Sequence, residues 1–124
     1  MELNHETVRS LLLKVEAEQR SLGWMLAIGS ENFEQFYAAT KLIEGGFLDG
    51  QVIAGMDEDE GEVMITSLTY RGHEFLDSVR EPEVWSAAKA GAKKAGAFSL
   101  EILAAIARAV VLQQVKQLTG LDVS

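Results

Sequence analysis

His73 and Asp77 are the two side chains whose spacing comes closest to a catalytic pair. They lie four residues apart, so on one helix the imidazole and the carboxylate can meet, as a general base and its orienting group do. Ser67, Thr69 and Ser78 occupy positions typical of a strand end, a helix cap and a helix interior, so none is placed as a nucleophile. We therefore expect His73 to be structural and the chain to be no enzyme.

Metal and phosphate chemistry have equally little support in the sequence. Two histidines without any cysteine leave a zinc site short of ligands, and the glycines follow neither the P-loop nor the dinucleotide-binding spacing. No cofactor and no bound metal are expected. The absence of cysteine also agrees with a reducing, cytoplasmic location, and MELNHETVRS lacks the basic and apolar regions of a signal peptide.

An acidic run lies where we expect the tip of a hairpin. It consists of Asp57, Glu58, Asp59, Glu60 and Glu62, with Gly61 one place too early for a calcium-binding EF-hand loop. Such crowded carboxylates repel phosphates within a Debye length of about 8 Å. A solvated hairpin tip, a weak divalent-cation site, and an acidic surface that imitates nucleic acid or docks on a basic protein are the three interpretations.

Charge is distributed unevenly along the chain, whose net charge is −8. Residues 1–80 hold six Lys/Arg and fifteen Asp/Glu, a net of −9, whereas residues 81–124 hold five and four, a net of +1. A domain that binds duplex DNA normally presents the opposite sign on its binding face. The clustered cations Lys89, Lys93 and Lys94 could touch phosphate, balance an acidic partner subunit, or form a solvated face.

The elements that must position these residues follow from hydrophobic periodicity and turn residues. Asn4 is expected to cap a helix to about residue 20, with an apolar stripe of Val8, Leu11, Leu12, Val15 and possibly Leu22. The apolar stretch 23–29 could be a short strand or a linker. Strands are expected over 51–56 and 62–68, after a turn at Asp49-Gly50, followed by a helix over 70–79 that Thr69 caps.

The helix expected over 31–44, capped by Ser30 or Asn32 and ended by Gly45-Gly46, is the candidate recognition helix. Its expected inward face comprises Phe33, Phe36, Tyr37, Thr40 and Ile43, with Leu42 beside it. Its outward face would then comprise Glu34, Gln35, Ala38, Lys41 and Glu44. Gln35 and Lys41 are the candidate DNA contacts on this helix, and a packing helix with a solvated acidic face is the alternative.

The pattern of residues 81–124 predicts two helices. Pro82 breaks the chain before a helix with Trp85, Ala88 and Ala92 on one face, which ends near Gly96. Ser99 is expected to cap a last helix over 100–118, closed by Gly120. That helix is apolar nearly all round and too short to span a membrane. Its apolar residues are expected either to fold back on Leu11–Leu13 or to form a homodimer interface, through Leu100, Leu103, Ile106, Val110 and Val111.

Three segments resemble an uncharacterised, phage-associated family of small winged-helix proteins, domain of unknown function 2513. They are KLIEGGFLDG, then LTYRGHEFLDSVR followed by VW, and SLEIL, which together cover roughly residues 37–106. The resemblance implies a winged helix-turn-helix fold and a phage or prophage setting, and it brings no biochemical activity with it. Residues 21–32 depart from the pattern, because a clear helix is expected there and GWMLAIGS is a poor one.

We therefore expect an α+β protein with a winged helix-turn-helix-like core over residues 1–80 and a C-terminal helical extension over 81–124 that makes a homodimer. The expected function is regulator-like DNA binding of phage type, although charge disfavours DNA. The alternative is an acidic protein-binding module, such as a phage-encoded adaptor or inhibitor of a host protein, that does not bind DNA.

Overall fold

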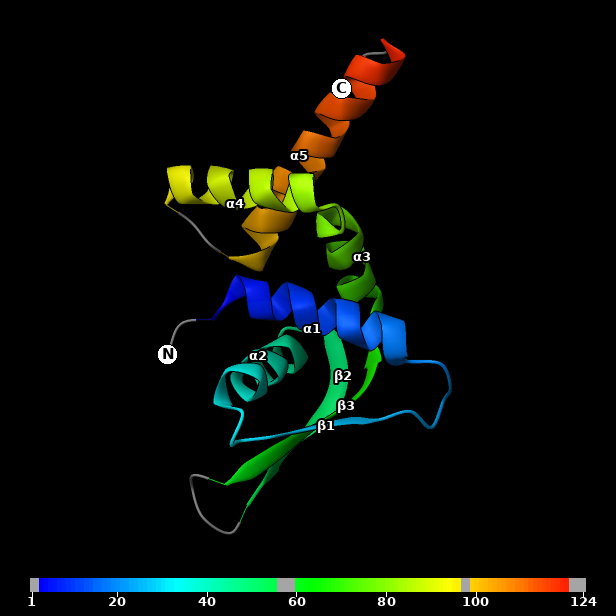
Figure 1. The fold of residues 1–124 in the computed structure, drawn as a ribbon, viewed down its shortest axis with the longest axis vertical. Coiled ribbons are helices and arrows are strands. Elements are labelled where there is room, and N and C mark those ends of the chain that lie inside the picture. The colour runs from blue at the N-terminus through cyan, green and yellow to red at the C-terminus, as the bar shows by residue number, and fades with distance from the viewer. Residues whose placement is uncertain (1–2, 56–59, 97–98, 121–124) are drawn as a thin grey trace. The chain divides into compact units, whose positions relative to one another are not determined.

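The computed structural model describes residues 3–55, 60–96 and 99–120 of the 124-residue chain. These residues form two compact units, an N-terminal unit (Met1–Glu74) and a C-terminal unit (Phe75–Ser124). The described elements are five helices and a three-stranded antiparallel sheet, so the α+β class is confirmed (Figure 1). In chain order they are α1 (His5–Glu18), β1 (Leu26–Gly29), α2 (Phe33–Glu44), β2 (Leu48–Ala54), β3 (Gly61–Leu68), α3 (Tyr70–Val79), α4 (Pro82–Ala95) and α5 (Leu100–Thr119).

The sheet of the N-terminal unit has the strand order β1-β3-β2, with both pairs antiparallel. The register places Ile28 and Val52 on either side of Val63, so these three side chains share one face of the sheet. Helices α1 and α2 contact this sheet and each other. Their buried residues close the core of the unit together with Ile28, Leu48, Val63, Ile65 and Leu68.

Helix α1 forms as its sequence predicts. The Asn4 side chain accepts hydrogen bonds from the backbone N–H groups of Glu6 and Thr7, which satisfies two donors that the first turn leaves without helical partners. Val8, Leu11, Leu12 and Val15 are all buried, as their spacing predicts. Leu22 is fully exposed beyond the helix end, so its inclusion in this stripe was wrong.

The stretch between α1 and α2, for which strand and linker were both open, contains strand β1. Residues 19–32 hold turns and this strand but no helix, so the extra helix of a helix-turn-helix is not found there. The sequence predicted a turn at Asp49-Gly50, and this prediction was wrong. Both residues lie inside β2, at a register shift where an added Cβ on Gly50 would come within 2.2 Å of the Met64 carbonyl oxygen.

Most of the remaining helices begin at hydroxyl residues or end at glycines, at the positions that the sequence predicts. Gly46, Gly96 and Gly120 all take positive φ just beyond the ends of α2, α4 and α5. Thr69 accepts a hydrogen bond from the Gly72 N–H at the start of α3, and Ser99 accepts one from the Ile102 N–H at the start of α5.

The C-terminal unit is built from the second half of α3 and from α4 and α5. Trp85, Ala88 and Ala92 form the buried face of α4, as predicted. Small residues let α4 and α5 approach closely: a Cβ added at Gly91 would lie 3.1 Å from the Ile106 side chain. Leu103, Ala104 and Ala107 of α5 are buried in this packing.

Candidate functional site

Helix α2 buries a different face from the one that its sequence predicts. Its buried residues are Ala38, Ala39 and Leu42. Ala38 was expected to point outward, so that prediction was wrong. The physical reason is close packing: small Ala side chains let α2 lie near α1 and the sheet, and the bulky aromatic residues are left toward the rim.

Three aromatic side chains consequently gather on the outer side of α2, and we call Phe33, Phe36 and Tyr37 the aromatic patch. The Phe33 ring lies 6.1 Å from that of Tyr37 and 6.4 Å from that of Phe36, centroid to centroid. Phe33 retains 51% of its exposure, and Phe36 and Tyr37 are half-buried. An exposed aromatic ring that contacts two partly exposed ones is typical of a binding surface rather than of a helix that only packs.

The aromatic patch extends to the tip end of the β2–β3 hairpin, where Ala54 pairs with Gly61. A Cβ added at Gly61 would lie 3.4 Å from the Phe36 ring, so this glycine lets the ring approach the start of β3. The Gly61 N–H donates to Ser30 Oγ (3.1 Å), and the Ser30 N–H donates to the Gly61 carbonyl (2.9 Å). The loop before α2 is thereby fastened to the hairpin that carries the acidic run.

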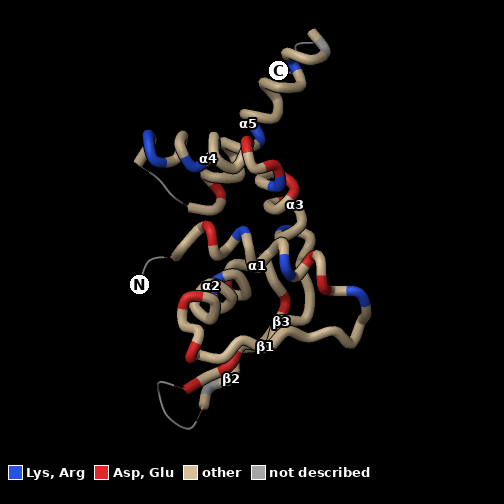
Figure 2. Tube along the Cα trace, viewed as in Figure 1, with Lys and Arg blue, Asp and Glu red and all other residues tan. Residues whose placement is uncertain are grey.

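Of that acidic run, Asp57, Glu58 and Asp59 lie outside the described residues, while Glu60 and Glu62 are exposed at the start of β3, beside the hairpin tip. Acidic residues also stand at both ends of α2, where Glu31, Glu34 and Glu44 are exposed (Figure 2). Exposed carboxylates thus lie near both ends of the helix that carries the aromatic patch, and one of them, Glu34, accepts hydrogen bonds from Asn4 and Thr7.

Lys41, a predicted DNA contact, is exposed but already engaged. Its ammonium lies 3.0 Å from Glu44 Oε2 and 5.6 Å from the Tyr37 ring centre. The hydrogen bond and charge of Glu44, and to a smaller extent Tyr37, raise the pKa of Lys41 above its ordinary value of 10.5. Lys14, the other lysine of the N-terminal unit, lies 4.0 Å from Glu18. Both lysines of this unit are therefore paired with a carboxylate on their own helix.

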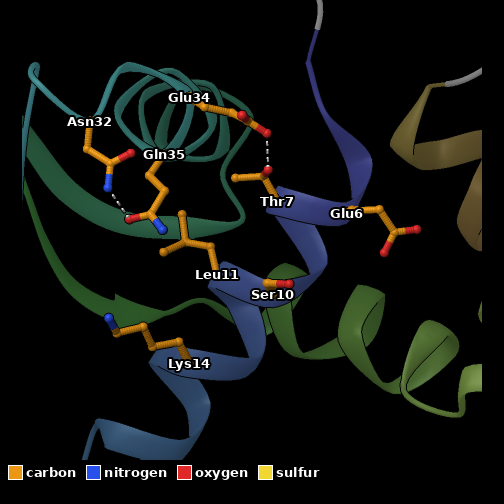
Figure 3. A pocket seen from close by; sticks show the side chains of 8 residues that line it. All are labelled: Glu6, Thr7, Ser10, Leu11, Lys14, Asn32, Glu34 and Gln35. Atoms are coloured by element: carbon orange, nitrogen blue, oxygen red, sulfur yellow. Dashed lines mark hydrogen bonds between the residues drawn. The ribbon is translucent and has the colours of Figure 1, made fainter.

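Gln35, the other predicted DNA contact on α2, lines an open hollow between α1 and the start of α2 (Figure 3). The hollow has a volume of about 360 Å³ and is lined by Glu6, Thr7, Ser10, Leu11, Lys14, Asn32, Glu34 and Gln35.

Hydrogen bonds already tie both sides of this hollow. Asn32 Nδ2 donates to Gln35 Oε1 (3.1 Å). Glu34 Oε1 accepts a hydrogen bond from Thr7 Oγ1 (Figure 3) and another from Asn4 Nδ2. Sequence reasoning missed the grouping of Asn32 and Thr7 around Gln35, because it depends on how α1 crosses α2.

The predicted basic cluster lies on α4 in the C-terminal unit. Lys89 is placed over the Trp85 ring, 5.3 Å from its centre, and Lys93 and Lys94 are exposed in the last turn. Cations in the last turn of a helix also interact favourably with the negative end of the helix dipole. This arrangement stabilises the helix without requiring a nucleic-acid ligand.

The predicted dimer residues of α5 divide into two groups. Leu103 is fully buried within the chain, and Leu100, Ile106 and Val110 are half-buried. Leu103 is therefore used inside the chain in the contact with α4. Val111 is exposed. Leu112, Val115 and Leu118 further along α5 are also exposed, and the predicted dimer interface did not include them.

His73 does not bond Asp77 as their spacing suggested. Its Nδ1 lies 3.9 Å from Glu16 Oε2 on α1, while Asp77 pairs with Arg80 at 2.8 Å. Across the described residues no group of three His, Asp or Glu side chains is arranged to hold a metal ion. None of the helices formed by those residues is long and apolar enough to cross a bilayer.

The sequence profile of the family described as "Hypothetical protein (DUF2513)" matches residues 2–98. The chain belongs to this family. It is also similar to an "Uncharacterized protein" of Haemophilus influenzae (strain ATCC 51907 / DSM 11121 / KW20 / Rd), with 28% identity over 117 residues that cover 91% of this chain and 98% of that protein. No solved structure matches the chain significantly.

Proposed function

We propose that this DUF2513 protein is a non-enzymatic, acidic protein-binding module whose docking surface is the aromatic patch on α2 with the carboxylates near the ends of that helix. The observation that carries the proposal is the exposure of Phe33, stacked on Tyr37, while Ala38, Ala39 and Leu42 form the buried face of the same helix. Aromatic side chains bury much area at little entropic cost and dominate the energetic centres of protein interfaces.

The charges around the aromatic patch specify the kind of partner. Glu31, Glu34 and Glu44 are exposed near the ends of α2, and each of the two lysines of the unit lies within 4.0 Å of a carboxylate on its own helix. A partner of complementary potential carries Lys or Arg around an apolar or aromatic centre, which steers association and sets specificity. The proposed partner is thus a basic protein surface, such as a host factor engaged by a phage-encoded adaptor or inhibitor.

A second candidate is duplex DNA, read by the N-terminal end of α2. It is favoured by the hollow that Asn32, Gln35 and Lys14 help to line, because such carboxamides bind adenine edges and a lysine can hold a phosphate. Lys41 on α2 would supply a further phosphate contact, and Lys89, Lys93 and Lys94 would offer a separate basic surface on the C-terminal unit. The surplus of negative charge over residues 1–80 ranks this candidate second.

A winged-helix origin suits either candidate. The order α1, β1, α2 and then the β2–β3 hairpin supports this proposal, because a winged-helix plan that lost one helix would have that order. We infer that the family kept the hairpin wing and shortened the helix-turn-helix, in a phage or prophage setting.

The test immobilises the purified protein, captures partners from a bacterial lysate, and repeats the binding with each purified candidate at rising salt. Phe33→Ala combined with Tyr37→Ala should weaken a true complex by roughly a thousandfold, since interface aromatic residues are worth about 2 kcal/mol or more each. Tyr70→Ala is the matched control, because Tyr70 is an exposed aromatic residue on α3, outside the patch. Equal loss of binding in both variants would contradict the assignment of the surface.

A further inference from the structure

The second half of α5 presents an apolar face that the packing with α4 does not use. Val111, Leu112, Val115 and Leu118 are exposed, and Leu118 keeps 86% of its exposure. Together with Arg108 these residues recur at three- and four-residue steps, so they lie on one side of the helix. A row of exposed aliphatic side chains on one helix face is typical of a surface that pairs with another element.

An apolar groove opens beside this face within the C-terminal unit. It has a volume of about 330 Å³ and is lined by Asp77 and Ser78 from α3 and by Arg108, Val111 and Leu112 from α5. The groove therefore shares the helix face with Leu118. The rise of about 1.5 Å per residue places this leucine roughly 10 Å further along α5.

A protruding leucine and an apolar groove on the same helix face are self-complementary. A two-fold axis perpendicular to α5 near Gln114 would bring Leu118 of each copy to the groove of the other, with the two helices antiparallel. Such an interface is isologous, so every contact occurs twice and the assembly closes at two chains.

Charge supports a second copy as the occupant. Beyond Glu101, the described part of α5 carries two cations, Arg108 and Lys116, and no carboxylate, whereas α3 places Asp77 at the rim of the groove. In the antiparallel arrangement the axis near Gln114 sets Lys116 of one copy opposite Leu112 of the other, beside the groove at whose rim Asp77 pairs with Arg80. We propose that the chain forms a two-fold dimer in which Leu118 of each copy enters the groove formed by Asp77, Ser78, Arg108, Val111 and Leu112 of the other. This inference is independent of the proposed function.

The experiment measures the mass of the full chain by sedimentation equilibrium over a range of micromolar concentrations. The wild type should be a dimer. Leu118→Asp should raise the dimer dissociation constant by roughly a hundredfold or more, because two buried leucines worth about 1.5–3 kcal/mol each are lost. Leu22→Asp is the matched control, since Leu22 is also an exposed leucine but lies in the N-terminal unit, and it should leave the dimer intact. A monomeric wild type at every concentration, or a Leu118→Asp dimer of unchanged affinity, would overturn the proposal.

Disulfide trapping tests the direction of the helices, because the chain has no cysteine of its own. Leu118→Cys and a size-tagged Ser78→Cys variant are oxidised separately and as a mixture. A disulfide needs Cα atoms within about 7 Å, so the mixture should give the cross-linked heterodimer far faster than either variant alone gives a homodimer. Efficient homodimer formation by Leu118→Cys alone would indicate parallel helices and contradict the arrangement.

Discussion

Because α2 buries Leu42 but leaves Phe33 half exposed, truncating these two side chains should change the free energy of unfolding by different amounts. Leu42 is fully buried, so Leu42→Ala removes aliphatic contacts and leaves a cavity, at a cost of about 2–5 kcal/mol. Phe33 keeps half of its surface in water, so Phe33→Ala should cost only about 1 kcal/mol, mainly from the lost ring contacts. Ala39→Leu should also destabilise, by about 1–3 kcal/mol, because position 39 has no room.

These changes are measured by urea unfolding of the N-terminal unit. The chain has two tryptophans, one in each unit, so a Trp85→Phe background makes Trp24 fluorescence report the N-terminal unit alone. Midpoints and slopes together give the free energy of unfolding of each variant. If Phe33→Ala destabilised the unit as strongly as Leu42→Ala, or Ala39→Leu were neutral, the aromatic residues would face the core and the argument for an exposed patch would fail.

Three further predictions follow from particular contacts. Gly72→Ala should lower stability by about 2 kcal/mol or more, because the added Cβ would lie 2.1 Å from the Phe47 carbonyl oxygen. This clash outweighs the better helix propensity of alanine. An unchanged midpoint of thermal unfolding would contradict the close contact. Asn4→Ala should cost about 1 kcal/mol through loss of the α1 cap, measured in the same way, and an unchanged midpoint would show that the cap contributes nothing. Because the pKa of Lys41 is raised in the folded state, its pair with Glu44 contributes fully to folding stability below the ordinary pKa of 10.5, and this contribution is lost as pH rises through the folded pKa. Glu44→Gln should move the Lys41 pKa down toward 10.5 in an NMR titration. No movement of that pKa would exclude the pair.

Local signals predicted the elements well because caps and helix stops act over a few residues. Asn4, Thr69 and Ser99 cap helices where hydroxyl and amide side chains were expected to do so, and Gly96 and Gly120 end helices with positive φ. Each of these residues satisfies backbone groups in its own turn, so no knowledge of the tertiary fold is needed.

Non-local packing set the features that the sequence did not reveal. The hydrophobic pattern ranks Phe33 above Ala38 and therefore assigns Phe33 to the inward face. Which of the two faces the core depends instead on how closely α1 and the sheet approach α2. Asp49-Gly50 has the composition of a turn, yet pairing with β3 draws both residues into a strand. The hollow around Gln35 combines α1 with the start of α2, so no local pattern could indicate it.

The central claim is that α2 offers a surface to protein and does not read duplex DNA. The most direct measurement is the fluorescence anisotropy of labelled random-sequence duplex DNA titrated with the purified protein at low salt. The account predicts no binding at micromolar protein, since a net charge of −9 over residues 1–80 opposes phosphate. Binding whose affinity falls steeply with salt and is lost in a Gln35→Ala, Lys41→Ala variant would contradict the account and establish α2 as a DNA-reading helix.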